Sequence, residues 1–304
     1  MANVRVFQVD AFTSQRFGGN PAGVVLDADA LSATDMRLLA RELGSADTAF
    51  VLAPDGPDHD LRVRFLTPRG EAAFIGHATL AVHAVFSTLG GPVLPRQKQA
   101  SGIVTVDVLQ AGATPRILIH QPPPPLRDTL PAALLAELLE VLGLPAASLD
   151  ARCPAMLAGA SSARVLLAVA DGSFLTHMQP DLPRLAALCT RVGAPGVFVF
   201  TLRPSVPDVY TEARMFCPAL GFAEDPVSGN AHALLGTYLL RHGLLGPRPA
   251  APASQGIIEF TGAQGHHMER AGRVTVALAL DESLLTSVSI VGEAVVAFAT
   301  SMTF

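Results

Sequence analysis

Residues 76–90 read Gly76-His-Ala-Thr-Leu-Ala-Val-His-Ala-Val-Phe-Ser-Thr-Leu-Gly90, and residues 229–243 read Gly229-Asn-Ala-His-Ala-Leu-Leu-Gly-Thr-Tyr-Leu-Leu-Arg-His-Gly243. Both stretches run from glycine to glycine and carry almost no charge, and a helix that is apolar all round belongs inside a domain. Arg64-Phe-Leu-Thr-Pro68 precedes the first, and Arg214-Met-Phe-Cys-Pro218 precedes the second. We therefore expect an internal repeat, in which each half wraps a sheet around one buried helix.

The rest of the chain alternates between strands and amphipathic helices. Ser32 is expected to cap a helix that ends at Gly44, and similar patterns predict helices at residues 131–142 and 182–192. Strands are predicted at residues 4–10, 24–26, 48–52, 61–65, 103–108, 116–120, 165–169, 197–202, 257–260, 273–280 and 288–298.

The best linker is Gln121-Pro-Pro-Pro-Pro125, which cannot form regular structure. It divides the sequence into an N-terminal domain of residues 1–121 and a C-terminal domain of residues 122–287. The last strand, about residues 288–304, is expected to return to the first domain.

Composition, charge and cysteine content argue against several classes of protein. Apolar residues make up 50% of the 304 residues and charged ones 15%, which is ample for two cores. A net charge of −5 without a Lys/Arg cluster argues against nucleic-acid binding. Three scattered cysteines do not make a disulfide framework. With no signal-peptide pattern and no long apolar stretch, we expect a soluble, cytoplasmic protein that does not enter a membrane.

When a buried helix begins at a glycine, its first N–H groups are unpaired and the positive end of the helix dipole faces outward. Such a start can bind an anion, and glycine lets the ligand approach the backbone. Two such starts, at Gly76 and Gly229, could hold one small carboxylate substrate. The alternative interpretation is ordinary capping, with solvent beyond the helix.

Several motifs resemble those of the PhzF-like isomerases of phenazine biosynthesis. They are Val9-Asp-Ala-Phe-Thr13, Phe17-Gly-Gly-Asn-Pro21, Phe74-Ile-Gly-His-Ala-Thr79, Glu224-Asp-Pro-Val-Ser-Gly-Asn230 and Gln264-Gly-His-His-Met268 with Gly272-Arg273. They follow one another in the family's order across essentially the whole chain. One departure is Glu269, where the family usually has a glycine, and it puts the conformation of that loop in question.

The resemblance implies an α+β fold of two pseudo-symmetric domains like those of diaminopimelate epimerase. Each would be a barrel-like, mostly antiparallel sheet around a central helix, with the active site between the domains. It also implies proton transfer without a cofactor, and a homodimer as the usual assembly.

Three residues match the family's catalytic positions. Asp47 stands where the family has a glutamate as general acid/base, and its carboxylate is set back by about 1.3 Å, which can cost about a hundredfold. His77, at a helix start that disfavours imidazolium, would assist as a neutral imidazole. Asp225 would contact polar groups of the substrate and influence Asp47. The alternatives are a loop cap for Asp47 and a helix cap for Asp225.

Binding donors are expected from Asn20, Gly76, Ser228, Gly229 and Asn230, and many relatives have serine in place of Asn230. Ile75 and Ser228 occupy the positions at which diaminopimelate epimerase and proline racemases carry two cysteines, which excludes two-thiol racemisation. Cys217 is interpreted as a core residue.

No metal site is expected. His77 and His83 do not share a helix face, and adjacent His266 and His267 are predicted to point to opposite sides of a strand.

The leading hypothesis is a cofactor-independent isomerase of a small carboxylate with an acidic C–H. Two rivals stay open: a catalytically silent protein that binds a small molecule, and an epimerase or racemase that uses Asp47 and a second, non-thiol base.

Overall fold

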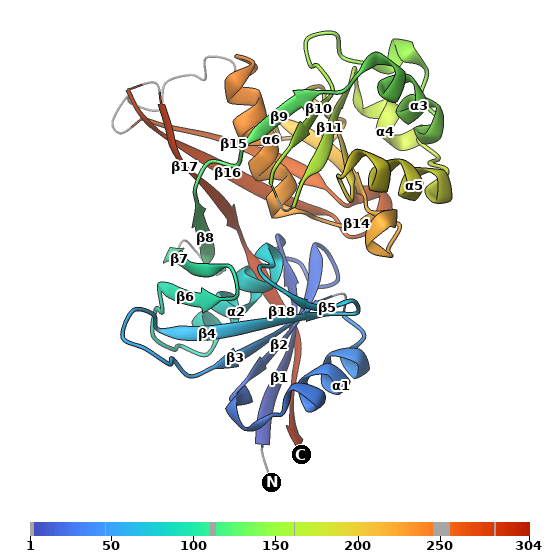
Figure 1. Cartoon of the computed structure of the whole chain (residues 1–304). Helices are drawn as coiled ribbons and strands as arrows, with labels where there is room; N and C mark the ends of the chain where they lie inside the picture. The colour runs from blue at the N-terminus through green and yellow to red at the C-terminus, as the bar shows by residue number, and fades with distance from the viewer. Residues whose placement is uncertain (1–2, 46, 110–113, 161, 246–255, 283) are drawn as a thin grey trace. The chain divides into compact units, whose positions relative to one another are not determined.

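The computed structural model describes residues 3–45, 47–109, 114–160, 162–245, 256–282 and 284–304 (Figure 1). They form an α+β fold with a large mixed sheet and few helices. Contacts divide the chain into two compact units. Unit 1 comprises Met1–Gln121 and Val291–Phe304, and unit 2 comprises Pro122–Ile290.

In unit 1, the central strand is β1, which pairs antiparallel with both β18 and β2. From β2 the sheet continues through a parallel pair with β3, an antiparallel pair with β4 and a parallel pair with β6. β6, β7 and β8 form an antiparallel meander, and β5 pairs with β4. The strands are β1 (Asn3–Ala11), β2 (Asn20–Leu26), β3 (Asp47–Leu52), β4 (Leu61–Thr67), β5 (Gly70–Ala72), β6 (Arg96–Gln99), β7 (Gly102–Leu109), β8 (Arg116–Gln121) and β18 (Ala294–Thr303).

The core of unit 1 is built on α2 (Gly76–Thr88). Every residue from Ala78 to Val85 is buried, and the helix packs against β1, β2, β3, β7, β8 and β18. Contact with so many strands leaves no face for solvent, which explains why the helix carries no charge.

The second helix of unit 1 is α1 (Ala33–Leu43), which lies on the same part of the chain that the sequence predicted. The Ser32 side chain accepts from the N–H of Asp35, and the Asp35 carboxylate accepts from the N–H of Ser32, a complete capping box. Gly44 ends the helix with φ 65°, a left-handed conformation that favours glycine. A short 3₁₀ turn, η1 (Ala28–Ala30), precedes it.

Ser32→Ala is expected to lower the free energy of unfolding by about 1 kcal/mol, because the substitution removes the cap of α1. Thr34→Ala, at an exposed position in the first turn, is the matched control. Urea unfolding of both variants checks the expectation. Equal stability of the two variants would contradict the capping role of Ser32.

In unit 2, the strands pair in the succession β10–β11 antiparallel, β11–β12 parallel, β12–β13 antiparallel, β13–β15 parallel and β15–β16 antiparallel. β9 pairs with β10, and β14 pairs with β13. The strands are β9 (Leu126–Thr129), β10 (Met156–Ala158), β11 (Arg164–Val169), β12 (Val197–Thr201), β13 (Thr211–Phe216), β14 (Glu224–Asp225), β15 (Ile257–Gln264), β16 (Gly272–Asp281) and β17 (Leu284–Gly292), which carries the chain into unit 1 at Val291.

The helices of unit 2 cover two faces of its sheet. One face packs an apolar core that includes residues of α3, α4 and α5, among them Leu138, Leu175 and Leu185. The other face packs α6, where Phe198 stacks edge-on against His232 and Phe200 against Tyr238. The helices are α3 (Ala132–Leu142), α4 (Gly172–His177), α5 (Leu182–Val192) and α6 (Gly229–Arg241), with 3₁₀ turns η2 (Ala146–Ser148), η3 (Pro218–Leu220) and η4 (His266–Met268).

The structure corrects two sequence predictions. The single strand expected at residues 288–298 is two strands, because Gly292 lies against Phe12 and the Glu293 carbonyl accepts from the N–H of Thr13 instead of continuing a ladder. His266 and His267 lie in the turn η4 and not on a strand, because Gly265 turns the chain with φ 87°. Glu269 then adopts φ 56°, the left-handed conformation that the family's glycine would favour.

Candidate functional site

Asp47 and His77 come together within unit 1. Asp47 is the first residue of β3, and His77 is the second residue of α2. His77 Nε2 lies 3.3 Å from Asp47 Oδ2, and their side chains are 11% and 19% exposed. A carboxylate and an imidazole this close and this buried can exchange and hold protons.

Burial raises the pKa of the Asp47 carboxyl from its ordinary value to about 6. A carboxyl with a pKa near neutrality is present in both its acid and its base form under physiological conditions. Such a group can take a proton and return it, and shifts of this kind cluster at functional sites.

The start of α2 has no side-chain cap. Its N-cap, Ile75, supplies no side-chain cap, and a Cβ added at Gly76 would meet nothing nearer than the Phe74 ring at 3.8 Å. Glycine here is therefore not required by close packing. A helix start without a side-chain cap can bind an anion through its first N–H groups. Asn20, buried at the start of β2, pairs with Ala11 across the ladder.

In unit 2, four of the predicted residues gather at the start of α6: Asp225, Ser228, Gly229 and Asn230. The Ser228 hydroxyl caps the helix by accepting from the N–H of Ala231 at 3.3 Å. The Asn230 amide donates to the carbonyl of Ser162 at 3.3 Å. The side chains of Ser228 and Asn230 thus hold the helix start in place.

Gln264 is a residue whose role the sequence did not reveal. Its Oε1 accepts from the N–H of Ser228 at 3.0 Å, and its Nε2 donates to the Asp225 carbonyl at 2.6 Å. One buried side chain thus bridges β14 and α6 and fixes the loop between them. The sequence signal for a role of Gln264 was its position in the Gln264–Met268 motif. A single sequence does not show which residues it contacts.

The three cysteines are free and buried. Cys217 is fully buried, and burial raises the pKa of its thiol well above the ordinary range. Burial also raises the pKa of Cys153 and of Cys189 to about 11. Thiolates are the nucleophilic form of cysteine, so these side chains fit core packing.

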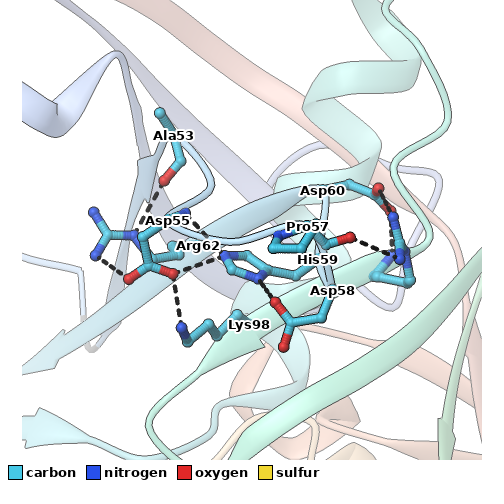
Figure 2. Close-up of polar contacts among 9 residues, drawn as sticks. Ala53, Asp55, Pro57, Asp58, His59, Asp60, Arg62 and Lys98 are labelled. Atoms are coloured by element: carbon cyan, nitrogen blue, oxygen red, sulfur yellow. Dashed lines mark hydrogen bonds and ion pairs between the residues drawn. The ribbon is translucent and has the colours of Figure 1, made fainter.

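A second polar cluster in unit 1 surrounds His59 in the turn between β3 and β4 (Figure 2). The buried His59 ring accepts from the N–H of Asp55 at Nε2, and its Nδ1 lies 2.7 Å from Asp58 Oδ1. Lys98, the only lysine of the chain, and Arg62 both pair with Asp55. Because each ring nitrogen has a protein partner, the cluster braces the turn and offers no open site.

The described part of the chain contains no group of three or more His, Cys, Asp or Glu side chains arranged to hold a metal ion. Within that same part, no helix is long and apolar enough to cross a membrane.

Comparisons with known proteins agree with the motifs. The uncharacterized isomerase YddE of Escherichia coli (strain K12) is 35% identical over 296 residues, which are 97% of this chain and 96% of that protein. A crystal structure of a PhzF-family phenazine biosynthesis protein from Bacillus anthracis has a TM-score of 0.86 at 26% identity, covering 100% of both chains. A hydroxyproline epimerase from Agrobacterium vitis shares the fold, with a TM-score of 0.58 at 12% identity over 99% of this chain and 91% of that one. The family model described as phenazine biosynthesis-like protein (PhzC-PhzF) matches residues 9–300, so the chain belongs to this family.

Proposed function

We propose that this protein is a cofactor-independent isomerase that moves a proton within a small carboxylate substrate by general acid/base catalysis. The observation that carries the proposal is Asp47: a carboxyl only 19% exposed, 3.3 Å from His77, with a pKa raised to about 6. The curated relative is named an isomerase, which supports the reaction class.

In the proposed reaction, the Asp47 carboxylate removes a proton from an acidic C–H of the substrate. The resulting carboxylic acid returns the proton to a different carbon, so that a double bond moves and no atom is gained or lost. His77 assists by holding the Asp47 carboxyl through the contact at 3.3 Å. We assign Asp225 the assisting role that the family resemblance implies.

The helix starts supply the binding donors in this proposal. The N–H groups at Gly76 in unit 1 and at Gly229 in unit 2 would bind substrate carboxylate oxygens, with Asn20, Ser228 and Asn230 shaping their surroundings. We propose a homodimer in the cytoplasm, with the small carboxylate as the ligand and neither nucleic acid nor membrane as a partner.

The repeat itself is also part of the proposal. Strand pairings in unit 1 run antiparallel, parallel, antiparallel, parallel, antiparallel from β1 to β7, and those in unit 2 follow the same succession from β10 to β16. Each succession has one buried helix, α2 or α6. This agreement supports two pseudo-symmetric domains.

One observation favours a second candidate, a silent binding protein. Asp47 stands where the family has the longer glutamate, so its carboxylate is set back by about 1.3 Å, enough to weaken catalysis. Such a protein would retain the helix starts and bind a carboxylate without changing it. An epimerase would instead need a second base beside Asp47.

A panel of small carboxylates with an acidic C–H, incubated with the protein in D₂O and followed by proton NMR, separates these functions. Deuterium incorporation together with a moved double bond is the expected result. Incorporation with inversion of configuration would instead establish an epimerase. Thermal stabilisation by a carboxylate without any exchange would establish a binder.

For a substrate found in this way, kcat/KM is expected to fall as the pH is lowered through about 6, because only the Asp47 carboxylate can accept the proton. A profile measured from about pH 4.5 to about pH 8.5 checks this. A rate that stays constant between about pH 5 and about pH 7 would contradict Asp47 as the base.

A further inference from the structure

Arg164 begins β11 in unit 2 and is 92% buried. One of its nitrogens, Nη1, donates to the backbone carbonyl of Ala163 at 2.8 Å. Its Nε is buried without a hydrogen-bond partner among the described residues, and no carboxylate in that part of the chain forms an ion pair with it. A guanidinium cannot deprotonate, so this buried charge is not neutralised by titration.

A buried charge without a partner is costly, and native structures normally satisfy buried donors. Each exception calls for an explanation, such as a bound ion that completes the set of contacts. The Nε–H and an adjacent nitrogen of a guanidinium form a planar fork that matches the two oxygens of a carboxylate. Its fixed positive charge and its unpaired Nε–H therefore suit Arg164 to bind an anion.

Arg164 lies close to the start of α6. Ser162, two residues before it, accepts the amide of Asn230, the second residue of that helix. The charges of Arg164 and of Asp225, the last residue of β14, both act on the pKa of the Cys217 thiol. The guanidinium and the N–H groups of Gly229 thus belong to the same end of unit 2.

The chain makes room for Arg164 by omitting a side chain. Gly196 immediately precedes β12, and a Cβ built on it would lie 3.2 Å from Arg164 Cδ and 2.7 Å from Cys217 Sγ. Any other residue at this position would displace the arginine or the cysteine.

Gly196 has a counterpart in unit 1. It follows Gly193, the residue that ends α5, by three positions, as Asp47 follows Gly44, the residue that ends α1. Asp47 and Gly196 each lie at the start of the second strand of a parallel pair, β2–β3 or β11–β12. Unit 1 has the Asp47 carboxylate at this position. Unit 2 has Gly196 there, and the Arg164 side chain lies against the space that a side chain of residue 196 would take.

We propose that Arg164 binds the substrate carboxylate through its Nε–H at the start of α6, next to the N–H groups of Gly229. The proposal deepens the proposed function and rests on it for the nature of the ligand. A neutral amide of the same shape is rejected, since it carries no charge to pair with the guanidinium.

Benzoate and acetate, with benzamide as the neutral counterpart of benzoate, are the probes. In protein labelled with ¹⁵N-arginine, the Nε–H resonance of Arg164 is assigned by its loss in Arg164→Lys. Titration with benzoate or acetate is expected to shift this resonance saturably, and benzamide is expected to leave it unchanged. This measurement uses the unaltered protein and does not depend on whether a variant folds.

The affinity for the carboxylate is then compared between variants. Arg164→Gln is expected to bind benzoate or acetate at least about tenfold more weakly, because it loses a charge-assisted pair, and Arg164→Lys is expected to fall in between. Arg127→Gln, which removes an exposed arginine from β9, is the control and should bind like the parent.

Two results would overturn the proposal: no saturable shift of the Arg164 resonance with either carboxylate, or unchanged carboxylate affinity in a folded Arg164→Gln. Failure here is distinguishable from failure of the proposed function. If carboxylate binding depends on Arg164 but no deuterium exchange occurs, the role of Arg164 stands and the isomerase function is rejected. If deuterium exchange occurs at the same rate in Arg164→Gln as in the parent, the isomerase function stands and the role of Arg164 is rejected.

Discussion

Asp47→Asn lowers turnover of the isomerised carboxylate by about 10²–10⁴-fold, the contribution that general acid/base catalysis supplies. The substitution keeps the size of the side chain and removes only its capacity to accept a proton. Carboxylate binding at the helix starts should survive. Steady-state kinetics and benzoate affinity, measured on the same preparation, separate the two effects. Asp128→Asn, an exposed position in β9, removes the same charge and is the control.

Asp47→Glu tests the departure from the family. If the pocket still suits the family geometry, the longer side chain retains or raises activity. If the substrate lies closer to Asp47, the extra methylene clashes and activity falls. The two results distinguish a substrate held as in the family from one held closer to Asp47. Parental activity in Asp47→Asn would instead make Asp47 a structural residue, and His77 or Asp225 would inherit the role.

Asp47→Asn should also stabilise the protein at neutral pH. The pKa of Asp47 is about 6 in the folded protein, against 3.8 as its ordinary value, so the folded state holds the proton more tightly. Between these two values the unfolded chain has lost the proton and the folded protein has kept it. Stability from this group is therefore lost as the pH rises from about 4 to about 6.

A difference of about 2 pKa units corresponds to about 3 kcal/mol. Asp47→Asn lacks this penalty, so its stability relative to the parent should increase by up to about 3 kcal/mol between pH 4 and pH 7.5. Urea unfolding of both proteins at the two pH values checks the prediction. An identical difference in stability at both pH values would show that Asp47 does not titrate near neutrality.

Local signals explain what the sequence could predict. The bounds of α1 follow from Ser32 and Gly44, since a cap and a left-handed glycine act within one turn of the helix. The predicted helix at residues 182–192 coincides with α5, which begins after Asp181 and ends at Gly193. The buried helices at Gly76 and Gly229 were visible because nothing charged interrupts them.

Features that depend on distant residues were not predictable. The break between β17 and β18 arises because Gly292 meets Phe12, which lies 280 positions away in the chain. Gln264 acquires its meaning only when the fold places it beside Ser228. Arg164 looks like any arginine before a strand until the structure shows that its Nε is buried.

The candidate site divides in the same way. Motif positions indicated Asp47 and His77, and the structure gives their contact and the burial that raises the pKa of Asp47. Neither the contact nor the burial follows from spacing, because thirty residues and two strands separate the two side chains.

The most direct test of the central claim is the rate at which Asp47→Asn incorporates solvent deuterium into the substrate, measured by proton NMR beside the parent protein. Asp47 as the acid/base predicts that exchange slows by about 10²–10⁴-fold while the variant stays folded and binds the carboxylate. Exchange as fast as in the parent would contradict the claim.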